Sequence, residues 1–158
     1  MEKDQASVIA NINMTLDLHR PVIDNMTSML KSLDSRQIKD MLSINMAPPT
    51  IHNVVKLVAD VLNNKPLPKT ADWQAIIKVV GIDNKKFLTR LIELDWSKVT
   101  VATVKHVSTA LYADDMNQDI VANKSVVCGV LCRWLNDGVK YHRVLMEIKE
   151  MKQEAGLE

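Results

Sequence analysis

Glycine and aromatic residues are scarce in this chain of 158 residues, and their scarcity argues against a β-rich fold. Only 4 glycines and an aromatic content of 4% are present. No stretch of convincing length alternates apolar and polar residues as a strand does. The common residues are Met, Leu, Ile, Val, Lys and Asp, a mixture that favours helix. We therefore expect an all-α protein.

Long apolar runs, a signal peptide and a strong net charge are also missing. The apolar runs are far shorter than the roughly 20 residues that a membrane-spanning helix needs. The polar start MEKDQASVIANIN has no apolar core of the kind a signal peptide carries. The formal net charge is +1, which disfavours binding to nucleic acid. We expect no membrane and no nucleic-acid partner.

Cysteine and histidine are too few and too scattered for a metal site or a catalytic centre. Cys128 and Cys132 share an apolar run, and no nearby Cys or His pair completes the roughly four ligands of a zinc site. We interpret both as buried reduced thiols of an intracellular protein. No Gly-rich phosphate loop, Ser/His/Asp set or pair of carboxylates at catalytic spacing is visible. We expect no catalytic residue, no metal and no cofactor.

Residues 4–46 carry the apolar spacing of one long helix. Steps of three and four, typical of a coiled-coil seam and with one missed step at His19, connect Ile9, Ile12, Leu16, Ile23, Met26, Leu30 and Leu33. Pro21 interrupts the seam, and because a mid-helix proline costs about 3 kcal/mol, we expect a packed partner to hold it. After Leu33 the seam slips at residues 34–36, which indicates either a stutter or a local break.

Pro48 and Pro49 end this helix and open the next one. The residue before a proline is pushed out of the α region, whereas proline is well tolerated in the first turn of a helix. The sequence then predicts short helices over residues 50–62 and 72–81, and within 82–95 and 97–115. In the first of these, the helical spacing places Asn53, Lys56 and Asp60 on the solvent face.

Residues 119–151 are predicted to form a second long helix. One apolar stripe contains Val127, Leu131, Trp134, Tyr141, Leu145 and Ile148, with Gly138 filling a missing step. A second possible stripe contains Leu135, Val139, His142 and Met146. Each long helix would measure about 60 Å. Two such helices joined through a compact domain must run antiparallel, so we expect a two-helix coiled-coil stalk that carries a bundle of short helices at its tip.

Five stretches in this order resemble the stalk tip of dynein heavy chains, the microtubule-binding domain. They are LHRPVIDNMTSMLKSLDSRQIKDM, MAPP, DWQAIIKVVG, NKKFLTRLIELD and SVVCGVLCRWLNDGVKYHRVL. The resemblance divides the chain into an outgoing stalk helix (1–47), a helical head (48–124) and a returning stalk helix (125–158). It also makes Pro48, Pro49 and Trp134 the joint between stalk and head.

The resemblance implies a partner and a binding surface. The partner is α/β-tubulin in microtubules, and the chain would continue into the rest of the dynein heavy chain, an AAA+ ATPase. The implied contacts are Lys56, Lys85, Lys86, Arg90, Asn123 and Lys124. Asp119 would either tune the affinity or only complement the dipole at the start of its helix. Asn123 falls where the family usually places a basic residue, and TIHN lengthens the link after the prolines, which shifts the placement of Lys56.

Two further expectations depend on this resemblance. The two imperfect stripes of the returning helix suggest that the stalk helices slide between two registers and thereby change the affinity for the track. The location would be the cytoplasm and its cytoskeleton, or the axoneme of a cilium or flagellum. The alternative function is a helical scaffold or adaptor that binds another protein through its long hairpin.

Overall fold

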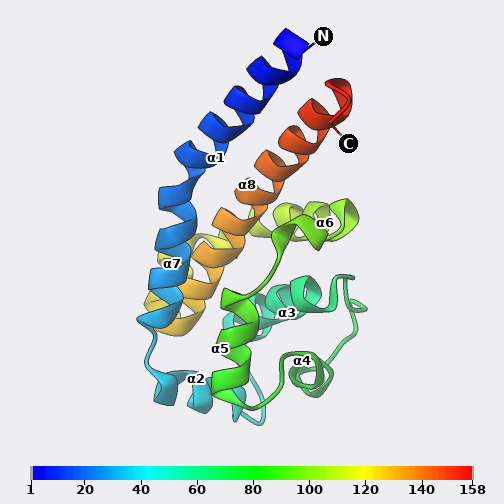
Figure 1. The fold of residues 1–158 in the computed structure, drawn as a ribbon. Helices are drawn as coiled ribbons and strands as arrows, with labels where there is room; N and C mark the ends of the chain where they lie inside the picture. The colour runs from blue at the N-terminus through cyan, green and yellow to red at the C-terminus, as the bar shows by residue number, and fades with distance from the viewer. Residues whose placement is uncertain (1, 158) are drawn as a thin grey trace.

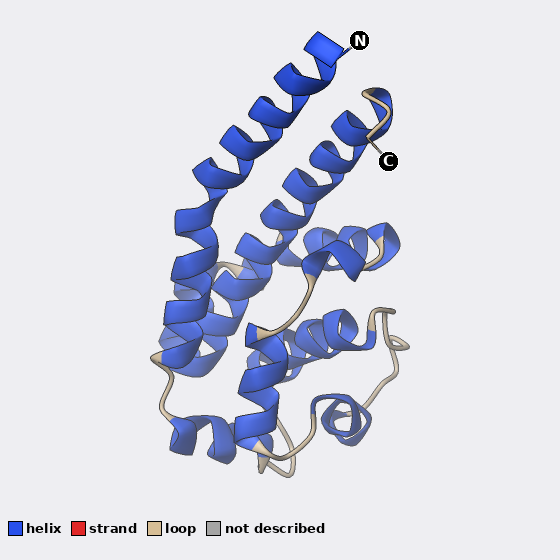
Figure 2. Ribbon diagram, in the orientation of Figure 1, coloured by secondary structure: helices blue, strands red, loops and turns tan. Residues whose placement is uncertain are grey.

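A computed structural model describes residues 2–157, and over that range the chain is all-α, with no strand (Figure 1, Figure 2). The two long helices, α1 (Glu2–Lys31) and α8 (Val126–Glu154), lie side by side and antiparallel, so that both termini meet at one end. The short helices pack at the other end: α2 (Ser35–Leu42), α3 (Pro49–Asn63), α4 (Trp73–Val80), α5 (Asn84–Ile92), α6 (Val101–Leu111) and α7 (Gln118–Lys124). Two 3-10 turns, η1 (Trp96–Lys98) and η2 (Asp114–Met116), complete the head. The expected stalk with a helical head at its tip is confirmed.

The outgoing helix is shorter than the sequence predicted. The single helix over residues 4–46 is wrong, because α1 ends at Lys31 and a new helix begins at Ser35. The Asp34 side chain accepts a hydrogen bond of 2.8 Å from the Arg36 backbone and caps α2, so residues 34–36 form a local break and not a stutter. With 30 residues, α1 measures about 45 Å and not 60 Å. Pro21 lies inside α1 without ending it.

The returning helix is also interrupted. The predicted continuous helix over 119–151 is wrong, because Ser125 adopts an extended conformation between α7 and α8 (φ −157°, ψ 122°). Its hydroxyl accepts a hydrogen bond of 3.1 Å from the Cys128 backbone and caps α8. Gly129 lets α7 pack closely on the first turn of α8, since a Cβ there would lie 2.8 Å from the Ala122 Cα.

Local capping signals set the limits of the short helices. Asp72 caps α4 through the Ala75 backbone, and Gly81, with a φ of +82° that suits glycine, ends it. Asp83 caps α5, and Thr100 caps α6. Helices were predicted in each of these segments, and those predictions are confirmed.

The centre of the head is α3, which packs against α4, α6 and α8. One continuous apolar cluster extends from Met26 and Leu30 of α1 through α3 to Leu131 and Leu135 of α8. A second, small cluster of Ile12, Val144 and Ile148 holds the two stalk helices together nearer the termini. The seam predicted for α1 is wrong at Ile9, which is 45% exposed. Val8 packs against the second cluster.

Candidate functional site

The cations Lys85 and Lys86 lie exposed in the first turn of α5, at the end of the head far from the termini (Figure 1). The Asp83 carboxylate accepts hydrogen bonds from both of their backbone N–H groups, at 3.0 and 3.1 Å. The Asn84 side chain donates to the Ser35 carbonyl at 3.0 Å and ties this turn to the start of α2. Both predicted cations are therefore held on a fixed backbone beside α2.

The neighbouring helix α2 adds two exposed cations, Arg36 and Lys39, that sequence reasoning missed. They were missed because residues 34–46 were assigned to the stalk. The buried face of α2 consists of Ile38, Met41 and Leu42. Because α2 packs on α5, these cations belong to the same end of the head as Lys85 and Lys86. We call this set (Arg36, Lys39, Lys85 and Lys86) the tip cations.

Arg90 is exposed, but its guanidinium has partners within the head. Its Nη1 donates to the carbonyls of Val79 at 2.7 Å and Val80 at 3.2 Å. These carbonyls belong to the last turn of α4, where a cation also complements the helix dipole. Arg90 therefore joins α5 to α4, and its role in binding the track stays a prediction.

Lys56 is buried for the most part and forms an ion pair with Asp60. The Lys56 Nζ lies 3.3 Å from the Asp60 Oδ2, and only 15% of the lysine side chain is exposed. The same oxygen lies 3.0 Å from the Nε2 of His106 on α6, and the Leu67 backbone donates to Oδ1 at 2.8 Å. The solvent-facing position predicted for Asp60 is wrong, because its side chain is fully buried. The charge of Lys56 serves first to neutralise this carboxylate.

Asn123 and Lys124 are exposed at the end of α7, next to the joint between α2 and α3. Lys124 lines a hollow together with Asp40 of α2 and with Ile44 and Ile51 on the two sides of the prolines. The returning chain therefore meets the outgoing chain where Pro48 and Pro49 redirect it.

The remaining residues of the joint fix the start of α3. Pro48 precedes the first turn, and its carbonyl accepts a hydrogen bond of 2.9 Å from the His52 backbone. The indole of Trp73 on α4 donates to the Ile44 carbonyl at 2.7 Å, which pins the link before the prolines. Asp119 is exposed in the first turn of α7, and none of the ion pairs found among residues 2–157 includes it.

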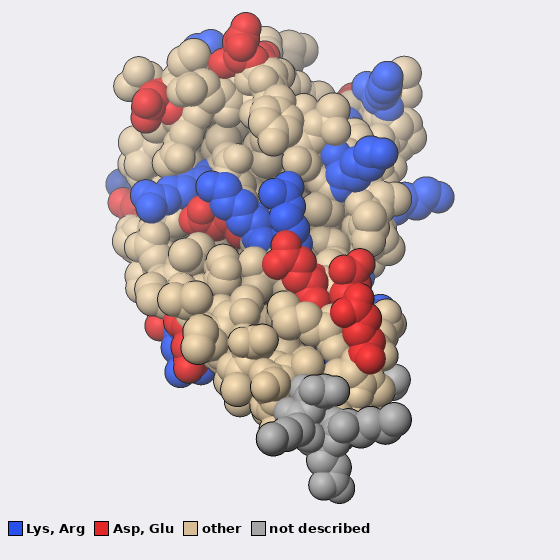
Figure 3. Space-filling model, turned by 90° about the horizontal axis from the view of Figure 1, so that it is seen from above, with Lys and Arg blue, Asp and Glu red and all other residues tan. Residues whose placement is uncertain are grey.

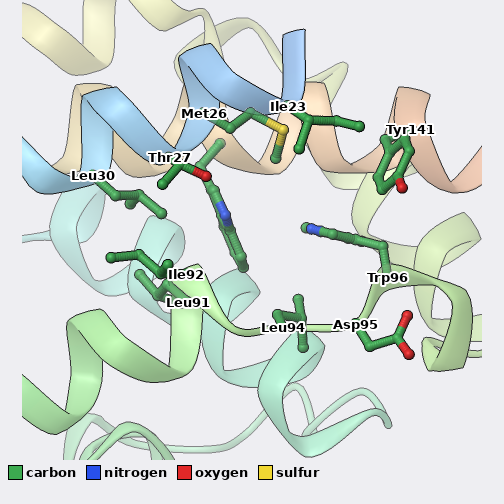
Figure 4. Close-up of a pocket in the computed structure, with 11 residues that line it drawn as sticks. Ile23, Met26, Thr27, Leu30, Leu91, Ile92, Leu94, Asp95, Trp96 and Tyr141 are labelled. Carbon is green, nitrogen blue, oxygen red and sulfur yellow. The ribbon is translucent and has the colours of Figure 1, made fainter. Parts of the chain in front are cut away.

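Trp134 lies where α1, α5, η1 and α8 meet. Its ring packs against Trp96 of η1, with ring centroids 5.1 Å apart. Trp96 crosses α8 at Gly138, where a Cβ would lie only 2.0 Å from the indole. Both rings line a cavity of about 190 Å³ beneath Ile23 and Met26 of α1 (Figure 4). The outgoing helix therefore rests on an incompletely filled surface at the level of the head.

The two apolar stripes of α8 face different partners. Ile148 of the first stripe packs on Ile12 of α1 together with Val144, which neither predicted stripe contains. In the other stripe, the Nε2 of His142 lies 2.8 Å from the Val99 carbonyl, which follows η1. Val139, His142 and Met146 line a groove with residues of α6. The second stripe is therefore not an alternative seam for α1, because it faces α6 and the segment after η1.

Neither metal chemistry nor reactive thiols have support in the described part of the chain. No cluster of His, Cys, Asp and Glu there could hold a metal ion. Burial raises the pKa of the Cys128 thiol to about 11 and also raises the pKa of Cys132. None of the described helices combines the length and apolarity needed to cross a bilayer.

The fold and the surface define a class of protein: a helical head, carried by two antiparallel helices, that presents cations at its far end. Residues 7–157 match the family described as the microtubule-binding stalk of dynein motor. The chain belongs to this family. Its members are non-catalytic, cytoskeleton-associated modules of dynein heavy chains.

Similar proteins include both flagellar and cytoplasmic dyneins. The flagellar outer-arm dynein alpha chain of Chlamydomonas reinhardtii is 25% identical over 92% of this chain. Cytoplasmic dynein heavy chains of Caenorhabditis elegans and Paramecium tetraurelia are 22% and 23% identical over 85% and 98% of it. The chain spans 3% of the length of each of these relatives.

Proposed function

We propose that this chain is the track-binding end of a dynein heavy chain and that the tip cations contact the acidic surface of the microtubule. The observation that carries the proposal is their position: Arg36, Lys39, Lys85 and Lys86 are exposed on two packed helices at the end opposite the termini. Cations gathered in this way speed association with an acidic partner, and their effect weakens as salt rises. Lys124 and Asn123 extend the surface at the joint.

Co-sedimentation with taxol-stabilised microtubules at low and high salt tests this surface. The variant Lys85→Glu/Lys86→Glu should pellet less than wild type, because two exposed tip cations are reversed while the buried Phe87 and Leu91 are kept. The control Arg20→Glu/Lys149→Glu changes the net charge equally on exposed stalk positions and should pellet like wild type. Equal binding by all three proteins would contradict the assignment.

We further propose that the chain transmits the state of a motor to this surface through α1. In this proposal α8 is the fixed helix, because it packs on α3, α6, α7 and η1. In contrast, α1 packs mainly on α8 and α5, passes over the cavity beside Trp96, and ends at the break before Asp34. A shift of α1 would therefore move α2 and, through the Asn84–Ser35 hydrogen bond, the start of α5.

This mechanism replaces the one based on two equivalent stripes of α8. Because His142 and Val139 are engaged by the head, sliding would occur along the single face that carries Val144 and Ile148. The motor itself, an AAA+ ATPase elsewhere in the heavy chain, is part of the proposal. The chain would work on microtubules of the cytoplasm or of an axoneme, since its relatives come from both kinds of dynein.

A further inference from the structure

A groove between α6 and α8 has no role in the functions proposed above. It consists of two adjoining hollows, of about 400 and 200 Å³, that share Ser108, Val139 and Arg143. Its apolar lining includes Val104 and Met146, and exposed Val101 extends it to the surface. The groove lies on the stalk side of the head, because α6 is the short helix nearest the two termini (Figure 1).

The charged side chains that line this groove are all cations, while the Asp137 carboxylate of α8 lies near Lys140. Lys105, Lys140 and Arg143 line it and are exposed, and the lining contains no Asp or Glu. None of these three cations takes part in the ion pairs found among residues 2–157. Seen from the stalk end, Lys and Arg side chains form a band across the molecule, and Asp and Glu side chains lie within it and on either side (Figure 3). An apolar floor with a cationic rim fits an acidic, extended peptide that carries an apolar side chain.

The position of the groove restricts which part of a microtubule could reach it. Residues 126 and 143 of α8 are separated by about 26 Å of helix rise, so the groove lies far from a track bound at the tip. Only a flexible segment of the track could cross that distance. About ten extended residues span roughly 33 Å, which is enough. A disordered, acidic tail at the surface of the track would have the required charge and reach.

We propose that the groove between α6 and α8 binds a disordered acidic tail of tubulin while the tip cations engage the body of the microtubule. This inference rests on the proposed function. The tail is tethered to the track, so its local concentration at the groove is high and its binding adds affinity. Because the tail is flexible, this contact does not fix the head to one site on the track.

Binding to intact microtubules and to microtubules whose tails have been removed by limited subtilisin digestion tests the inference. Wild type should bind intact microtubules about three- to tenfold more tightly, the range expected for two or three exposed charge pairs. Lys140→Glu/Arg143→Glu should lose this difference and bind digested microtubules as wild type does. Ser108→Leu, which fills the groove without changing its charge, should also reduce the difference. Circular dichroism checks that each variant is folded.

The control Arg20→Glu/Lys149→Glu carries the same change in net charge on the stalk and should keep the difference between intact and digested microtubules. If the control loses it as well, general charge and not the groove is responsible, and the inference is wrong. It is also wrong if wild type binds both kinds of microtubule equally, or if Lys140→Glu/Arg143→Glu keeps the full difference. Failure of wild type to bind either kind would instead overturn the proposed function.

Discussion

Replacing Lys56 with methionine separates a structural role of this lysine from a role in binding the track. Methionine keeps the apolar stem and removes the charge that lies 3.3 Å from buried Asp60. Removing one partner of a buried ion pair costs about 3–5 kcal/mol. His106 still contacts the carboxylate, and 15% of the lysine side chain is solvated, so we expect about 2 kcal/mol. For a domain of this size, that corresponds to a decrease in melting temperature of about 4–8 °C.

A double-mutant cycle on the free energy of unfolding in urea measures the pair directly. Lys56→Met, Asp60→Asn and the double variant should give a coupling energy of about 0.5–3 kcal/mol. The matched control is Lys85→Met, which removes an exposed cation and should leave the melting temperature unchanged while weakening co-sedimentation. A melting temperature for Lys56→Met within a degree of wild type, together with zero coupling, would refute the structural role and leave Lys56 available for the track.

Four further perturbations test the packing around the site. Gly138→Ala places a methyl group against the Trp96 indole. The overpacking, of about 1–3 kcal/mol, should outweigh the gain in helix propensity and lower the melting temperature by several degrees. An unchanged melting temperature would contradict the contact between Gly138 and Trp96. Trp134→Ala removes a side chain that is 1% exposed and should cost about 3–5 kcal/mol, or about 6–20 °C; a change of a degree or two would place the ring at the surface. Arg90→Glu removes the hydrogen bonds to the end of α4 and should lower the melting temperature as well as the microtubule affinity, whereas Lys86→Glu should lower the affinity alone. Because burial raises the pKa of Cys128 to about 11, its thiol should react with a disulfide reagent at neutral pH only as fast as the protein opens; rapid reaction of the folded protein would refute this burial.

Local signals made much of the fold predictable from the sequence. Asp72 and Gly81 mark the two ends of α4, and the two prolines mark the start of α3, because each acts on the backbone beside it. The break at Ser125 was missed because it depends on one serine cap between two helix-forming segments. The slip after Leu33 was visible, but choosing between a stutter and a break required the capping bond of Asp34.

Tertiary contacts account for the errors at the candidate site. Asp60 has the spacing of a solvent-facing residue, and its burial follows from His106, far along the chain, and from the backbone at Leu67. The second stripe of α8 looked like a seam for α1, since periodicity shows which residues share a face but not which element covers it. Arg36 and Lys39 belong to the head because α1 ends at Lys31 and α2 begins as a separate helix at Ser35. Since the sequence predicted one continuous helix here, these cations were not assigned to the head.

The central claim is that the position of α1 along α8 sets the affinity for the microtubule. Two disulfide-locked forms test it: Ile12→Cys with Ile148→Cys, and Ile12→Cys with Val144→Cys, since all three residues belong to one stalk cluster. The two locks differ by four residues of α8, or about 6 Å. The buried Cys128 and Cys132 should not interfere with either lock. The dissociation constants of the two locked proteins for microtubules should differ clearly, and reduction should abolish the difference. Equal dissociation constants with intact folding would contradict the claim.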